Sequence, residues 1–162
     1  MKRKTALYGL LVALAFIFSY IEVLVPIPVG IPGIKLGLAN GVTLTALYLL
    51  RPADALAVSV LRILLAGLTF GSPMTMLYSL CGGLLSFAVM WLCRRSDRFS
   101  VVGVSIAGGV SHNIGQLALA AVVLATPAVA WYAPVLLVTG TVTGALIGLV
   151  CRLLLPRLEK LR

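Results

Sequence analysis

Charged residues are scarce in this chain, and acidic ones are the scarcest. Charged side chains make up 10% of the 162 residues, and only four residues are Asp or Glu. The single histidine and the three cysteines, which lack metal-ligand or redox spacing, give no basis for a metal site. The chain also lacks a Ser-His-acid set, a glycine-rich loop after a strand and a Walker lysine. We therefore predict no catalytic residues, no metal and no cofactor.

Hydrophobic residues are in large excess by comparison. They form 61% of the chain, and the mean hydropathy is +1.14. A water-soluble domain of this length cannot hide so much apolar surface in its own core, because small domains have a high ratio of surface to volume. Lipid is the other available solvent. We therefore predict one integral membrane domain, residues 1–162.

Breaks in the apolar pattern divide the chain into six candidate transmembrane helices, so an all-α polytopic bundle is predicted. They cover about residues 5–25, 34–50, 55–70, 74–93, 101–125 and 134–155. The first could also be a signal peptide, but its apolar run is too long and no small-residue cleavage site follows it. Segments 34–50 and 55–70 are shorter than the roughly 20 residues that a spanning helix needs, so they could be tilted, broken or re-entrant. Residues 26–33 (PIPVGIPG) predict a structured loop.

Basic residues concentrate in alternate connections, which predicts the orientation. The net charge is +9, and Lys and Arg lie at the N-terminus, in 51–54, in 94–98 and in the C-terminal tail. Connections 26–33, 71–73 and 126–133 contain neither. Because basic loops stay in the cytoplasm, we predict a plasma-membrane protein with both termini cytoplasmic. Nucleic acid is not a predicted partner, because the basic residues follow segment ends and no binding motif is present.

Small residues recur at helical spacing in two segments. Gly140, Gly144 and Gly148 are four positions apart, and Gly9 and Ala13 form a similar pair in the first segment. Small residues at this spacing let helix backbones approach closely. Two interpretations stay open for each set: packing inside the bundle, or docking of a partner membrane protein.

Polar residues inside or beside apolar segments are the candidate site residues, because each is costly in lipid. They are Glu22, Lys35, Asn40, Arg62, His112, Asn113 and Gln116. Arg62 lies in the middle of its segment (SVLRILL), too deep for an easy escape to the interface. His112 and Gln116 share a helix face, and Asn113 neighbours Gln116.

Two interpretations of these residues stay open. Arg62 could be a buried structural group, either paired with Glu22 or hydrogen bonded to Asn40 and Gln116. Alternatively, the set lines a polar pocket that opens outward and binds a small solute. Since Lys35 and Arg62 outnumber the one acid, an anionic or strongly polar small-molecule substrate is then expected.

The same residues carry a resemblance to a known family. The matching blocks are 33–40 (GIKLGLAN) after the proline-rich loop, 61–65 (LRILL) with Gly71-Ser72, 79–86 with Gly82-Gly83 and Met90, and 108–116 (GGVSHNIGQ). They resemble the Gx transporter family, also named heptaprenyl diphosphate synthase component I. The resemblance covers almost the whole chain, in order.

The resemblance implies a transport role first. The family is similar to the S components of energy-coupling factor transporters, six-helix proteins that capture a vitamin or metal beneath a lid formed by the first loop. They then topple on a coupling subunit driven by two ATPases. By resemblance, 26–33 would be the lid, and Gly9 and Ala13 would dock the coupling subunit in the lipid membrane. The chain would then carry a small polar or anionic solute with energy from these partners.

The second family name implies a different role, as an accessory membrane subunit in isoprenoid or menaquinone synthesis. Prenyl transferases hold Mg²⁺ with aspartate clusters. This chain has only Asp54 and Asp97, far apart, so it cannot supply such a site alone. Lys35 and Arg62 could contact a diphosphate, and the apolar bundle could accept a prenyl chain. A third interpretation is a structural assembly factor without a ligand.

Overall fold

The computed structural model describes residues 2–24 and 37–160, and the elements there are helices without a strand. In chain order these are α1 (Lys2–Leu24), α2 (Leu38–Leu49), α3 (Pro52–Thr69), α4 (Pro73–Arg95), α5 (Val101–Leu124), the 3₁₀ helix η1 (Pro127–Tyr132) and α6 (Ala133–Glu159). The predicted all-α class is confirmed. The predicted lid, 26–33, and Lys35 lie outside the described residues.

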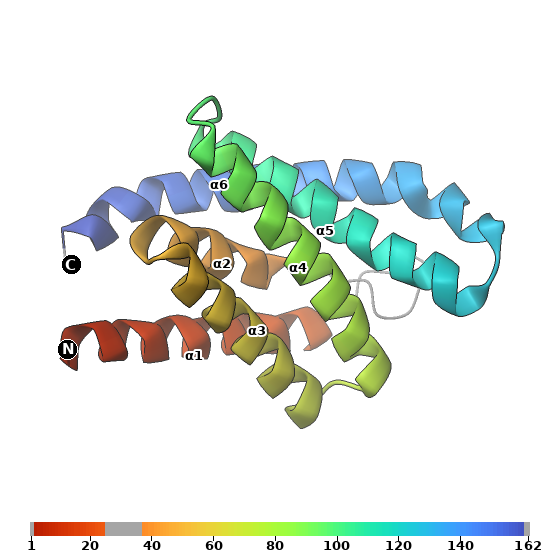
Figure 1. Ribbon diagram of the computed structural model, residues 1–162, viewed down its shortest axis with the longest axis horizontal. Coiled ribbons are helices and arrows are strands. Elements are labelled where there is room, and N and C mark those ends of the chain that lie inside the picture. Colours follow the sequence, from red (N-terminus) through yellow and green to blue (C-terminus); the bar gives the residue numbers. More distant parts are fainter. Residues whose placement is uncertain (1, 25–36, 161–162) are drawn as a thin grey trace.

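Five of the described helices are long and apolar enough to cross a membrane, namely α1, α3, α4, α5 and α6. The chain is therefore a multi-pass helical membrane bundle. The exception is α2, whose twelve residues extend about 18 Å, well short of the hydrocarbon core. Figure 1 shows the two ends of the chain on the same side of the bundle.

Prolines explain where the predicted helix bounds were wrong. We predicted starts at 55 and 74, but α3 and α4 begin at Pro52 and Pro73, since a proline in the first turn sacrifices no hydrogen bond. Ser72 and Thr75 add a capping box to α4. We also expected Pro156 to follow the last helix, whereas α6 continues through it to Glu159. Pro156 costs α6 one helical hydrogen bond and its ring crowds the carbonyl four residues earlier, but only three helical residues follow it.

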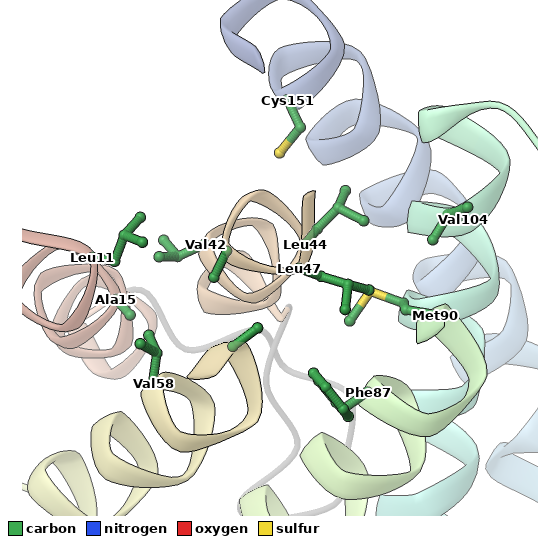
Figure 2. Packing of buried hydrophobic residues seen from close by; sticks show 12 residues of the cluster. Leu11, Ala15, Val42, Leu44, Leu47, Val58, Phe87, Met90, Val104 and Cys151 are labelled. Atoms are coloured by element: carbon green, nitrogen blue, oxygen red, sulfur yellow. The ribbon is translucent and has the colours of Figure 1, made fainter. Parts of the chain in front are cut away.

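The short helix α2 lies at the centre of the bundle. Ten of its twelve residues are buried, as expected for a helix that is apolar around most of its circumference. Figure 2 shows side chains from α1, α3, α4, α5 and α6 converging on it, among them Leu11, Val58, Met90 and Cys151. Within the described ranges, α1 packs on α2 and α3, and its backbone does not closely approach that of α6. Helix α2 therefore separates the first helix from the last.

Glycines bring α5 and α6 into backbone contact. A Cβ atom added at Gly144 would lie 2.8 Å from Ile106 Cα, and one at Gly148 would lie 2.8 Å from Val102 Cα. Of the two interpretations of the Gly140, Gly144 and Gly148 stripe, the geometry supports packing inside the bundle. The pair on α1 differs, because Gly9 and Ala13 are exposed and an added Cβ at Gly9 meets no atom within 4 Å.

Candidate functional site

Arg62 is held inside the bundle by two other helices. Its side chain is 5% exposed, its Nη1 donates to Ser19 Oγ on α1 (3.3 Å), and its Nη2 donates to Asn40 Oδ1 on α2 (3.2 Å). Glu22, also buried, is the acidic group whose charge acts on this guanidinium. Among the described residues, Arg62 Nε has no hydrogen-bond partner. The arginine therefore does not extend to an interface, and part of its donor capacity is unused.

Asn40 lies beside Arg62 in the first turn of α2. Because a guanidinium only donates, the atom that faces Arg62 must be the amide oxygen, which leaves Nδ2 on the other side. Asn40 is 6% exposed, and its Nδ2 has no partner among the residues described. Gly37 enters the helix with φ +80°, a backbone conformation that favours glycine. A Cβ there would lie 3.2 Å from Asn40 Nδ2 and 4.0 Å from His112 Cδ2, so Gly37 lies between these two side chains.

Both ends of α2 meet a charge of the opposite sign from another helix. Glu22 Oε1, near the end of α1, accepts a hydrogen bond from the Leu38 N–H. At the other end, Arg94 of α4 donates to the Leu47 carbonyl and stacks over the Tyr48 ring, with its Cζ 4.8 Å from the ring centroid. A helix carries partial positive charge at its N-terminus and partial negative charge at its C-terminus, so both contacts stabilise α2. These two contacts matter because an isolated helix of twelve residues is only marginally stable.

His112 and Gln116 of α5 contact α4 at Gly82. An added Cβ at Gly82 would lie 2.9 Å from Gln116 Cγ and 3.0 Å from His112 Cε1. Gln116 has no exposed surface, and neither its Oε1 nor its Nε2 has a hydrogen-bond partner in the described part of the chain. A buried polar group without a partner costs about 1–3 kcal/mol. Such groups are rare in native proteins and call for an explanation.

Asn113 faces a different helix. Its Nδ2 donates to the Leu136 carbonyl of α6 at 2.7 Å, and an added Cβ at Gly140 would lie 2.9 Å from that nitrogen. This contact satisfies the amide through helix packing. The structure thus groups Glu22, Asn40 and Arg62 near the start of α2, with His112 beside Gly37. Gln116 lies one turn further along α5 against Gly82, and Asn113 faces α6.

Two further buried polar residues, Ser19 and Thr43, were missed in the sequence, and Ser19 belongs to the polar cluster around Arg62. Ser19 accepts from Arg62, and Thr43 Oγ1 is buried without a partner among the described residues. Ser19 lies three positions before Glu22 and Thr43 three after Asn40, a helical spacing that could have revealed both. Ser19, Arg62, Thr75 and Ser79 also line a cavity of about 10 Å³, near the minimum that holds one water molecule.

A second, apolar concavity lies on the other side of α2. It measures about 390 Å³ and is lined by α1, α2 and α6, for example by Leu14, Val42 and Val150. Among the described residues of this lining, the polar side-chain atoms belong to Thr45 and Cys151. The groove suits a hydrocarbon chain.

Comparison with known proteins adds one finding. A family model described as heptaprenyl diphosphate synthase component I matches residues 11–154, a range that includes Glu22, Arg62 and Gln116. Comparisons with curated proteins and with solved structures give no match. Since the matched range covers most of the sequence, the chain belongs to the heptaprenyl diphosphate synthase component I family.

Proposed function

We propose that this protein is a substrate-binding membrane subunit, which captures a small polar solute inside the bundle and passes it across the membrane with energy from partner subunits. The buried Gln116 amide, without a partner among the described residues, carries this proposal. If the bundle had been selected only for stability, replacing this side chain by an apolar one would make it more stable. A ligand that bonds to the amide gives a reason to keep it.

The position of α2 supports the same proposal. In many transporters, a shortened helix begins near the middle of the membrane and directs its N-terminal N–H groups at the substrate. Helix α2 fits this pattern in two respects: it is short, and Asn40, Arg62 and His112 lie near its start. We propose these three residues and Gln116 as ligand contacts. Lys35 and the lid at 26–33 are proposed by their position in the sequence, immediately before α2.

Partner subunits are part of the proposal, because the chain carries no nucleotide-binding motif. A coupling subunit with two ATPases would dock on α1 at Gly9 and Ala13, where both residues are exposed. Small, exposed residues let the backbone of a partner helix approach closely. Because Lys and Arg concentrate in alternate connections, we propose that both termini are cytoplasmic and that the lid lies outside the plasma membrane.

The direct experiment is mass spectrometry of small molecules retained by the purified protein. We expect wild type to release one polar compound on denaturation, and Gln116→Met and His112→Ala to lose it. Arg152→Met serves as control, because Arg152 is an exposed residue of α6. Equal retention by all folded variants would show that the ligand, if any, binds elsewhere.

The family name favours a second candidate, an accessory subunit for prenyl diphosphate synthesis. The name component I implies a partner component, and the groove of about 390 Å³ offers an apolar surface for a prenyl chain. Co-purification separates the two candidates. A soluble prenyl transferase would support synthesis, and a coupling subunit with ATPases would support transport.

A further inference from the structure

The start of α2 gathers hydrogen-bond donors around a single acid. We propose, on the basis of the function above, that the Glu22 carboxylate occupies the position of an anionic ligand group. A carboxylate or phosphate of the substrate would displace Glu22 from the Leu38 N–H and bind there. Glu22 is then not a direct ligand contact but a built-in substitute for the ligand.

Hydrogen-bond donors at this site outnumber the acceptors that the described residues offer them. Arg62 Nε and Asn40 Nδ2 belong to side chains that are more than nine-tenths buried, and neither atom has a partner among the described residues. The Asn40 oxygen accepts from Arg62, and the unpartnered polar atoms, Arg62 Nε and Asn40 Nδ2, are both donors. The Leu38 N–H is a third donor. A ligand group that satisfies all three must present several acceptor oxygens.

The charges at this site favour an anionic ligand. The Arg62 guanidinium and the N-terminus of α2 both favour an anion, and a cationic ligand would meet the buried guanidinium. An incoming anion would also meet the Glu22 carboxylate, and two carboxylates sharing one site repel each other. The ligand therefore binds only when Glu22 leaves the Leu38 N–H or takes up a proton. Glu22 lies two residues before the end of α1.

The start of α2 already accommodates a carboxylate oxygen. Glu22 Oε1 already accepts from a backbone N–H at this helix end, which demonstrates that a carboxylate oxygen fits there. A phosphate has further oxygens that could accept from Arg62 Nε and Asn40 Nδ2 at the same time. Planar guanidinium groups bind both types of oxyanion strongly.

The test compares anion binding by wild type, Glu22→Gln and Glu22→Ala. The thermal unfolding midpoint of each detergent-solubilised protein is titrated with acetate, inorganic phosphate and diphosphate, with acetamide as the neutral control and chloride to hold ionic strength. Glu22→Gln keeps an oxygen that can accept from Leu38, so this variant should fold even if Glu22→Ala does not. Glu159→Gln is the matched control, because it removes an exposed acid at the end of α6.

We expect Glu22→Gln to bind at least one oxyanion about tenfold more tightly than wild type, the equivalent of about 1.4 kcal/mol. Glu159→Gln should bind like wild type, and acetamide should not shift any midpoint. Weaker or unchanged oxyanion binding in Glu22→Gln, or no oxyanion binding by any variant, would overturn the inference. The proposed function would still stand if Gln116→Met lost the compound that wild type retains, and would fall separately if wild type retained none.

Discussion

Replacing Gln116 by methionine is expected to make the ligand-free protein more stable. Both polar atoms of this side chain are buried without a partner among the described residues. Methionine has an unbranched chain of similar length, so its Cγ can keep the place beside Gly82 that Gln116 Cγ occupies. The substitution thus removes the polar atoms and retains the packing.

Two energies set the size of the expected increase in the free energy of unfolding. Leaving a buried polar group unsatisfied costs about 1–3 kcal/mol in proteins generally. In membrane proteins, side-chain hydrogen bonds average about 0.6 kcal/mol and reach about 1.7 kcal/mol, because the unfolded chain in the membrane also finds partners. We therefore expect a gain of about 1–2 kcal/mol in the free energy of unfolding.

The assay is equilibrium unfolding in mixed micelles of a mild detergent and sodium dodecyl sulfate, followed by circular dichroism. Asn113→Ala, on the same helix, is the control and should lose about 1 kcal/mol, because Asn113 donates to the Leu136 carbonyl at 2.7 Å. If Gln116→Met were destabilised as much as Asn113→Ala, the Gln116 amide must have a structural partner. The argument for a ligand at that position would then be lost.

The same unfolding assay checks three further changes. Gly144→Ala should cost about 1–3 kcal/mol, because its Cβ would lie 2.8 Å from the backbone of α5, which cannot shift cheaply. Gly9→Ala, the identical change in open space, should stabilise α1 by up to about 1 kcal/mol, and a loss there would mean that this face is already packed. Arg94→Ala should cost about 1–2 kcal/mol, because it removes both the hydrogen bond to Leu47 and the contact with the Tyr48 ring. An unchanged free energy in Arg94→Ala would refute the role of that arginine at the end of α2.

Apolarity alone was sufficient to predict most of the fold. Five predicted spanning segments correspond to helices long enough to cross, because a run of hydrophobic residues in lipid must form helix to satisfy its backbone. The sequence could not determine where α2 begins. That start depends on Gly37 and on Glu22, a residue of a different helix. The 3₁₀ helix η1 was also missed, because short turns of this kind lack a hydrophobic period.

The candidate site was predictable in its members but not in its arrangement. Residues such as Arg62 and Gln116 are conspicuous because charged and amide side chains are rare inside apolar segments. Their partners were not predictable in the same way. Asn113 and Gln116 lie three positions apart on one helix, yet one bonds to α6 and the other lies against α4. Which neighbour each meets depends on how the glycines set the distances between helices.

The two charges at the ends of α2 also fix its position along its own axis. Glu22 and Arg94 hold the helix from opposite directions, through Leu38 at one end and Leu47 at the other. Sliding α2 toward either surface would pull one contact apart and compress the other, so neither direction is favourable. The backbone N–H groups at its start therefore keep a constant depth relative to α1 and α4, even when the whole molecule tilts in the bilayer.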